Sequence, residues 1–304
     1  MKKATYIWLD GELVPWDDAN IHVMTHTLHY GLGAFEGIRC YKRADGRSAV
    51  FRLDGHMKRL LESCKIVTLK SPYNRQQLID ATVETIRANE LGSCYIRPLV
   101  FVGHGAMGLY AIDNPTRVMI AAWEWGAYLG DEALNHGIRA KVSSYTRPGV
   151  NAFMARGKIV GQYVNSILAK REAVKSGYHE AILLDGNGYV TEASGENIFA
   201  VRNGKVTTTP LGASILAGIT RDTSITLLRE LGYEVIEGRM TRDDLYVADE
   251  VFFTGTAAEV TPVREIDDRE IGEPGPICKA LQARYFDIVR GSAADHHEWL
   301  TWID

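Results

Sequence analysis

The sequence predicts an α+β fold, because strands joined by short hairpin turns are interspersed with amphipathic helices. Hairpin turns are indicated by Asp10-Gly11 and by the segments DGNG and RNGK, each flanked by strand-like residues. Several other segments carry apolar residues at helical spacing, and this mixture differs from the regular alternation of a doubly wound parallel sheet. A chain of 304 residues can bury a sizeable core as two domains or as one large one.

The first half of the chain is predicted to contain a hairpin, two helices and two long strands. Residues 54–68 have apolar side chains at helical spacing, and Gly92 follows a second helical segment as a stop signal. The predicted elements in order are a hairpin over 6–14, helices over 54–68 and 74–89, and strands over 94–103 and 116–125.

The second half is predicted to contain a meander of strands, with helices before and after it. Residues 125–137 are the best linker candidate, because glycines and charges interrupt the apolar pattern there. The predicted elements in order are a strand over 138–144, a helix over 161–175, strands over 181–185, 189–193, 198–201 and 206–210, a helix over 220–232, a strand over 250–255 and a helix over 275–289.

Composition excludes several classes of partner. The formal net charge of −4 gives no reason to expect nucleic acid or an anionic membrane. No apolar run approaches the roughly 18–20 residues of a membrane-spanning helix, and polar residues interrupt the N-terminus before a signal-peptide core could form. Scattered cysteines without a C-x-x-C pair are typical of reduced thiols, so a cytoplasmic location is expected; they are Cys40, Cys64, Cys94 and Cys278.

Two glycine-threonine segments are candidate anion sites. In LAGITRD, Ile219 and Thr220 begin a helix whose free N–H groups and dipole would attract a phosphate, and Thr220 could also cap the helix. In FFTGTAAEV, Thr256 and Ala257 could present adjacent N–H groups after a strand. An ordinary helix cap and an ordinary turn are the competing interpretations.

Lys158 and Glu192 are the candidate catalytic groups. Lys158 lies between Gly157 and Gly161, which allow close approach, and a desolvated lysine can act as a Schiff-base nucleophile. Glu192 stands where a strand ends, and a carboxylate there could keep a cationic ring nitrogen protonated. A solvated loop lysine and a simple turn remain the alternatives from these residues alone.

Histidines recur in HVMTHTLHYG at positions 22, 26 and 29. Their spacing superficially suits a metal ion, but no carboxylate or cysteine completes a ligand set and no H-E-x-x-H motif is present. We therefore expect packing and interface hydrogen bonds, and no metal site.

The order of these motifs resembles that of a known family. The segments HTLHYGLGAFEGIRCY, HMKRL, YIRPLVFVG, GKIVGQYVNS, TEASGENIF, LAGITRD and ADEVFFTGTAAEVTPV are similar to the successive motifs of branched-chain amino acid aminotransferases. These are fold-type IV enzymes that depend on pyridoxal 5′-phosphate. The resemblance extends from about Tyr6 to the C-terminal helix, and several motifs together are highly specific.

The resemblance implies an architecture and an activity. It implies a small N-terminal α+β domain (1–124), a linker (125–134) and a larger cofactor-binding α+β domain (135–304). It implies a homodimer, or an assembly of dimers, in which the neighbouring subunit lines part of each active site. The implied reaction transfers amino groups between leucine, isoleucine or valine and 2-oxoglutarate, giving branched-chain 2-oxo acids and L-glutamate.

The resemblance also implies roles for individual residues. Lys158 would hold the cofactor as a Schiff base, Glu192 would pair with its ring nitrogen, and Tyr163 would bond its phenolic oxygen. Four residues would hold the phosphate: Arg59, Ile219, Thr220 and Thr256. Tyr95 and the backbone of Thr256 and Ala257 would bind the substrate α-carboxylate, and Arg97 would receive an acidic side chain. The side-chain pocket would be walled by Phe35, Tyr128, Tyr163 and a partner's Tyr30.

Residues 103–115 depart most clearly from the family pattern, which leaves fine substrate preference open. D-amino acid aminotransferases, R-selective amine transaminases and aminodeoxychorismate lyases share the fold class and are alternatives. A non-catalytic module that binds a phosphate ligand is a fourth, although the presence of both Lys158 and Glu192 argues against it, since binding alone requires neither.

Overall fold

The computed structural model of the chain describes residues 2–126 and 130–303, which fold into two compact units of mixed helix and strand. The predicted α+β class is confirmed. The first unit comprises Met1–Gly126, Gly157–Gln162 and Asp287–Asp304, and the second comprises Ala127–Arg156 and Tyr163–Phe286. The chain therefore returns twice to the first unit, whereas the division predicted from the sequence keeps everything after residue 134 in one domain.

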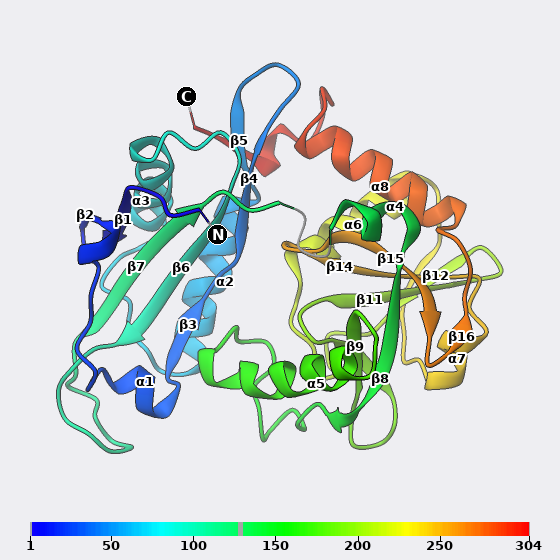
Figure 1. Cartoon of the computed structure of the whole chain (residues 1–304), viewed down its shortest axis with the longest axis horizontal. Helices are drawn as coiled ribbons and strands as arrows, with labels where there is room; N and C mark the ends of the chain where they lie inside the picture. The colour runs from blue at the N-terminus through cyan, green and yellow to red at the C-terminus, as the bar shows by residue number, and fades with distance from the viewer. Residues whose placement is uncertain (1, 127–129, 304) are drawn as a thin grey trace. The chain divides into compact units, whose positions relative to one another are not determined.

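An antiparallel sheet forms the first unit, with strand order β17-β5-β4-β6-β7-β1-β2 and β3 paired with β6 (Figure 1). The predicted hairpin at Asp10-Gly11 is present, and both of its turn residues have positive φ. The strands are β1 (Tyr6–Leu9), β2 (Glu12–Pro15), β3 (Gly33–Phe35), β4 (Ile38–Lys42), β5 (Ser48–Phe51), β6 (Cys94–Val102), β7 (Thr116–Trp123) and β17 (Leu300–Trp302).

Two long helices cover one face of this sheet. Because side chains alternate along β6, Ile96 and Val100 point into a core that they share with Met57 and Leu60 of α2 (Leu53–Ile66). Burial of each such side chain contributes roughly 1.5–3 kcal/mol. The other long helix, α3 (Arg75–Ala88), begins with a capping box between Asn74 and Gln77. The helical segments are η1 (Trp16–Asp18), α1 (His26–Tyr30), α2 (Leu53–Ile66), α3 (Arg75–Ala88), η2 (Val160–Gln162) and η3 (His297–Trp299).

A mixed sheet forms the second unit, with strand order β10-β9-β8-β15-β14-β11-β12-β13 and β16 paired with β15. Strands β8 and β9, β8 and β15, and β12 and β13 pair in parallel, and the other pairs are antiparallel. The strands are β8 (Ile138–Thr146), β9 (Glu180–Leu184), β10 (Val190–Ala193), β11 (Asn197–Arg202), β12 (Lys205–Thr208), β13 (Val235–Glu237), β14 (Glu250–Gly255), β15 (Glu259–Ile266) and β16 (Arg269–Glu270).

Helices pack on the sheet of the second unit at β8, β9 and β14. Helix α5 (Tyr163–Lys175) runs along β8 and β9 (Figure 1) and buries Ala169 and Ala173 against Ala181 and Leu183. Another packs against β14 and buries Leu227 and Leu228. The helices are α4 (Asp131–His136), α5 (Tyr163–Lys175), α6 (Ile219–Glu230), α7 (Arg242–Tyr246) and α8 (Pro276–Val289).

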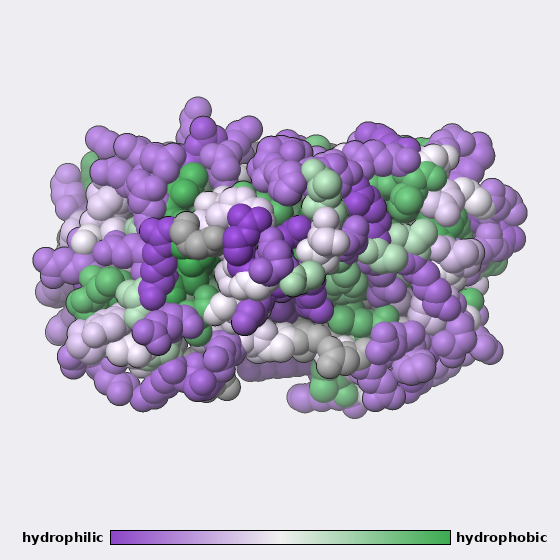
Figure 2. All heavy atoms as spheres, turned by 90° about the horizontal axis from the view of Figure 1, so that it is seen from above, coloured by the Kyte–Doolittle hydropathy of each residue, from purple (hydrophilic) through white to green (hydrophobic). Residues whose placement is uncertain are grey.

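The surface is largely polar on the face seen in Figure 2, where apolar side chains form scattered patches among hydrophilic ones. Across residues 2–126 and 130–303, every helix is too short or too polar to cross a membrane.

Candidate active site

Lys158 lies in the short segment Gly157–Gln162 of the first unit, whose backbone is fixed at several points. The Lys158 N–H donates to Ser63 Oγ at 3.0 Å, and its carbonyl accepts from the Phe35 N–H at 3.1 Å. Its Nζ lies 5.0 Å from the centroid of the Phe35 ring. The lysine is therefore positioned by its own backbone as well as by its flanking glycines.

Gly31 and Gly161 bring this segment against the end of α1. The Gly161 N–H donates to the Gly31 carbonyl at 3.0 Å. Gly31 has a φ of +71°, and a Cβ built there would lie 2.9 Å from Gly161 Cα. The contact is between two backbones, so it requires the absence of a side chain at Gly31.

A buried ionic cluster of Glu36, His56 and Arg59 lies in the same unit. The Glu36 carboxylate accepts from Arg59 Nε at 2.7 Å and Nη2 at 2.8 Å, and from His56 Nδ1 at 2.8 Å. Burial alone would raise the pKa of Glu36, but the charges and hydrogen bonds of Arg59 and His56 outweigh it and hold that pKa well below its usual range. Burial lowers the pKa of His56, and the charge and hydrogen bond of the Glu36 carboxylate oppose this effect. Two guanidinium nitrogens of Arg59 are thus fixed by a permanent anion.

Tyr95, Arg97 and Phe35 meet on the sheet face opposite α2 and α3, as the alternation along β6 predicts. Arg97 Cζ lies 4.8 Å from the Phe35 ring centroid and 5.5 Å from that of Tyr95. A Cβ at Gly37 would lie only 1.9 Å from Tyr95 Oη, so this glycine makes room for the phenol.

Arg97 also lines a mainly apolar cavity of about 400 Å³ together with Leu28, Phe101 and Trp123. Its Nε is buried and has no hydrogen-bond partner within the described part of the chain. A buried donor without a partner costs about 1–3 kcal/mol, so this atom would gain from an acceptor on a bound molecule.

Two histidines of the N-terminal tract and Tyr30 have contacts of their own. His26 Nε2 is 2.8 Å from the Gly108 carbonyl, and His29 Nε2 is 3.0 Å from the Val23 carbonyl. Tyr30 is exposed, and its ring centroid lies 4.5 Å from that of His26 with the two ring planes tilted by 35°. These side chains bond to backbone or face solvent in this chain.

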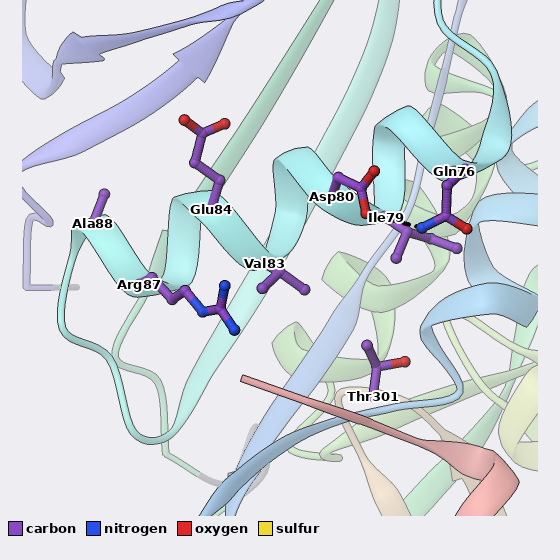
Figure 3. A pocket seen from close by; sticks show the side chains of 8 residues that line it. All are labelled: Gln76, Ile79, Asp80, Val83, Glu84, Arg87, Ala88 and Thr301. Carbon is purple, nitrogen blue, oxygen red and sulfur yellow. Dashed lines mark hydrogen bonds between the residues drawn. The ribbon is translucent and has the colours of Figure 1, made fainter. Parts of the chain in front are cut away.

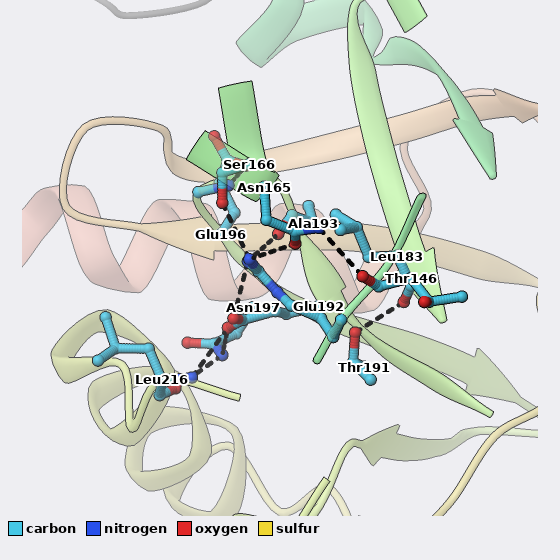
Figure 4. Close-up of polar contacts among 12 residues, drawn as sticks. Thr146, Asn165, Ser166, Leu183, Thr191, Glu192, Ala193, Glu196, Asn197 and Leu216 are labelled. Carbon is cyan, nitrogen blue, oxygen red and sulfur yellow. Dashed lines mark hydrogen bonds and ion pairs between the residues drawn. The ribbon is translucent and has the colours of Figure 1, made fainter. Parts of the chain in front are cut away.

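Glu192 is the centre of a buried polar cluster in the second unit (Figure 4). Its Oε1 forms an ion pair with Arg147 Nη2 at 2.9 Å. Its Oε2 accepts from Asn197 Nδ2 at 3.2 Å and from the Leu216 N–H at 3.1 Å. Because three donors converge on it, the carboxylate is held in one orientation.

The first turn of α6 offers backbone N–H groups next to this cluster. Gly218 is the N-cap residue and provides no side-chain cap, while Ile219 and Thr220 form the first turn. The prediction that Thr220 caps the helix was wrong, because the helix starts one residue earlier and Thr220 lies buried inside it. A Cβ at Gly218 would lie 2.0 Å from Asn197 Oδ1, so Asn197 and the turn fit together only with glycine there.

The other predicted residues of the second unit lie at the ends of neighbouring elements. Thr256 and Ala257 form the turn between β14 and β15, which follows the pairing of Thr254 with Asn197. Tyr163 is the first residue of α5, three residues before Ser166, which bonds to Arg147. Tyr128 lies outside the described residues.

A second buried carboxyl, Glu196, follows Glu192 in the same motif. Burial and the nearby Glu180 carboxylate raise the pKa of Glu196 to about 8, against the opposing effect of the Lys170 ammonium. Lys170 Nζ itself pairs with Glu180 at 2.6 Å. Glu196 is therefore mainly protonated near pH 7.

Sequence reasoning missed several polar residues of these clusters, among them Glu36, His56 and Arg147. Glu36 stands in an apolar stretch, and a carboxylate buried there requires cationic partners, which is a usable signal. The sequence contains no comparable signal for Arg147, because its partner Glu192 lies far along the chain.

A separate groove of about 660 Å³ runs along the outer face of α3 beside Thr301 (Figure 3). Asp80, Glu84 and Arg87 supply its charges. None of the predicted site residues lines it, and two carboxylates at its edge do not favour a phosphate ligand.

Known proteins resemble this chain over its full length. Residues 33–266 match the family model described as amino-transferase class IV. The chain is 52% identical over 299 residues to a branched-chain-amino-acid aminotransferase of Pseudomonas aeruginosa, covering 98% of this chain and 97% of that one.

Solved structures give the same picture. The branched-chain amino acid aminotransferase of Escherichia coli superposes with a TM-score of 0.96 at 47% identity, covering 99% of this chain and 100% of that one. The branched-chain amino acid aminotransferase from Thermobaculum terrenum, in its PLP-bound holo-form, superposes with a TM-score of 0.93 at 35% identity, covering 100% of both chains.

Proposed function

We propose, from the premise that the chain belongs to the class IV aminotransferase family, that it is a branched-chain-amino-acid aminotransferase. It exchanges the amino groups of leucine, isoleucine and valine with 2-oxoglutarate, giving branched-chain 2-oxo acids and L-glutamate. The observation that carries this function is the full-length likeness to enzymes of that activity. The family resemblance inferred from the sequence motifs is confirmed.

The cofactor is pyridoxal 5′-phosphate, and the residues present fit it. The second unit has an uncapped helix start at Gly218, built against Asn197, and a buried carboxylate held by three donors at Glu192. The first unit supplies a lysine on a fixed backbone. When bound, pyridoxal phosphate withdraws electrons from the substrate Cα and so acidifies its proton.

For the cofactor-binding residues we propose the roles that the family resemblance implies. Lys158 Nζ is the covalent anchor, and as a free amine it moves the proton taken from the substrate Cα. Glu192 keeps the ring nitrogen protonated through its negative charge, and the Tyr163 hydroxyl bonds the phenolic oxygen. The phosphate is bound by Arg59, Ile219, Thr220 and Thr256.

Substrate binding divides between a common and a variable part. Tyr95 and the N–H groups of Thr256 and Ala257 bind the α-carboxylate that all substrates share. The apolar side chain is received by walls formed from Phe35, Tyr128, Tyr163 and Tyr30 of the partner subunit. Arg97 receives the γ-carboxylate of glutamate, which the buried Nε without a partner in the described part of the chain supports.

We also propose a homo-oligomer and a cytoplasmic location. Large apolar side chains are exposed around α1 and in the loop before β7, including Val23, Leu28, Leu109 and Tyr110, as a surface covered by a second copy would require. All four cysteines are buried free thiols, which supports a reducing compartment.

The test is a steady-state panel of amino donors with 2-oxoglutarate as acceptor. L-leucine, L-isoleucine and L-valine should give L-glutamate with kcat/KM values at least about 10²-fold above those of D-alanine and an (R)-amine. Comparable or higher values for the D-amino acid or the amine would assign the chain to another activity of the same fold class. Absence of turnover with every donor would refute the proposal.

A further inference from the structure

We propose that Arg147 is a positioning residue of this reaction, which acts through Glu192 by fixing its carboxylate and keeping it ionised. The inference rests on the proposed function, because it assumes that Glu192 pairs with the ring nitrogen of pyridoxal phosphate. Arg147 was not predicted from the sequence, and it is here assigned a role through the contacts of its guanidinium.

Arg147 lies just after β8, and its two Nη atoms bond to different elements. Nη2 pairs with Glu192 Oε1 at 2.9 Å and donates to the Ala193 carbonyl at 3.2 Å. Nη1 donates to Ser166 Oγ at 3.0 Å and to Asn165 Oδ1 at 3.3 Å. The guanidinium therefore ties the strand that carries Glu192 to the first turn of α5.

Glu192 depends on this arginine for its charge balance. The side chains of Arg147 and Glu192 are each only 9% exposed, so the pair is almost fully removed from water. The donors from Asn197 and Leu216 are neutral. A buried carboxylate that loses such a cationic partner takes up a proton more readily, and a protonated Glu192 could not hold a ring nitrogen cationic.

The neighbouring acid makes this dependence stronger. Glu196 and Glu192 lie near enough for their charges to repel each other, so ionisation of either is disfavoured by the other. Arg147 is a cation that bonds directly to Glu192 and not to Glu196 in the described contacts. It thus selects which of the two carboxyl groups is the anion near neutral pH.

A lysine could replace the charge of Arg147 but not its geometry. The planar fork holds Glu192 from one Nη and α5 from the other, whereas an ammonium is a single point of charge on a flexible stem. Arg147→Lys should therefore restore part of what Arg147→Met loses. The matched control is Arg139→Met, which breaks ion pairs with Glu265 and Asp268 at the start of β8.

The experiment measures two quantities on wild type and variants. The first is the dissociation constant of pyridoxal phosphate from the apoprotein, followed by absorbance. The second is the maximal single-turnover rate, with its half-saturating concentration, for L-leucine and for L-glutamate. Both half-reactions require electron withdrawal by the protonated cofactor ring. Arg147→Met should therefore lower both maximal rates by the same factor, about 10–100-fold, and change the half-saturating concentrations by less than about 3-fold.

The decisive comparison places Arg147→Met in a Glu192→Gln background. If Arg147 acts through Glu192, adding Arg147→Met to Glu192→Gln should lower the maximal rates by less than about 3-fold, because the carboxylate that Arg147 positions is already absent. Multiplicative effects in the double variant would show that Arg147 acts independently and would overturn the inference. If the cofactor-bound Arg147→Met variant keeps wild-type rates and, like Arg139→Met, has only a lower melting temperature, Arg147 has a structural role alone.

Arg147→Lys keeps the test possible if Arg147→Met does not fold, since its rates should lie between those of wild type and Glu192→Gln. Rates of Arg147→Lys equal to those of wild type would contradict the positioning role. Failure of the wild-type protein to bind pyridoxal phosphate or to transaminate would refute the proposed function itself, together with this inference.

Discussion

Arg97 is the residue on which the use of two unlike substrates depends. An apolar wall favours leucine by area burial, roughly 25 cal/mol per Å², but the same wall rejects an unpaired carboxylate. Arg97 stands beside the Phe35 and Tyr95 rings, and its Nε lacks a partner among the described residues. Its stem can therefore contact an aliphatic chain while its head is available to a γ-carboxylate.

Arg97→Met tests this division of labour, because it keeps much of the apolar stem and removes the charge. The half-reaction with glutamate should be weakened more than that with leucine, by roughly 2–4 kcal/mol in the ratio of rate to dissociation constant. Single-turnover measurements with each amino acid give the two values. An equal loss in both half-reactions would mean that Arg97 serves the shared α-carboxylate or the fold.

Single residues were predictable from the sequence where the chemistry is local. The shared sheet face of Tyr95 and Arg97 follows from strand alternation, and the structure confirms it. The pairing of Glu36 with His56 and Arg59 was not predicted, because it joins residues from separate segments of the chain. Such pairs depend on tertiary packing, which cannot be predicted from local propensity or from the spacing of residues.

At the scale of elements, the segment 157–162 is the one whose position matters most. Its glycines were correctly seen as allowing close approach, but the sequence could not say what approaches. The structure shows that the neighbour is the backbone of Gly31, at the left-handed end of α1. The same applies to α6, whose start is fixed by the fit of Gly218 against Asn197 rather than by a Thr220 cap.

Gly31→Ala should displace the segment that carries Lys158. The new methyl group would meet Gly161 Cα at 2.9 Å, and the φ of +71° is costly for alanine by roughly 1 kcal/mol before that collision. We expect the fraction of protein that forms the Schiff base, measured by absorbance at saturating pyridoxal phosphate, to fall several-fold. Gly177→Ala is the matched control, since its φ is +84° and a Cβ there meets nothing within 4 Å. Equal losses in both variants would trace the effect to backbone strain alone.

At the scale of the whole molecule, the sequence predicted the α+β class and most elements, but not the path of the chain between the two units. The C-terminal strand β17 pairs with β5, and the Ile303 N–H bonds to the Ser48 carbonyl. A contact between segments so far apart in the chain leaves no periodic or compositional trace. Domain boundaries drawn in sequence order therefore miss it.

Stability should depend on pH through Glu196. Its pKa is about 8 in the folded protein and near 4.5 when the chain is unfolded, so the contribution of its proton to stability is fully present below about pH 4.5. As pH rises the unfolded chain releases this proton first, and stability is lost until pH passes about 8. Glu196→Gln mimics the protonated form and should not show this loss.

The melting temperature of Glu196→Gln should therefore rise above that of wild type as pH increases from about 5 to about 8.5, by roughly 5 °C or more at the upper end. Glu234→Gln, which alters an exposed carboxylate of the same unit, is the control and should show no such trend. A constant difference between Glu196→Gln and wild type at all pH values would show that Glu196 ionises as an ordinary carboxyl group.

The central claim is that Lys158 carries the cofactor of this aminotransferase, and reductive trapping tests it most directly. The holoprotein is treated with borohydride, digested, and analysed by mass spectrometry for phosphopyridoxyl-lysine. We expect one modified peptide, with the adduct on Lys158, and none from Lys158→Ala treated in the same way. An adduct on a different lysine, or unmodified Lys158 in a protein that still transaminates, would contradict the account.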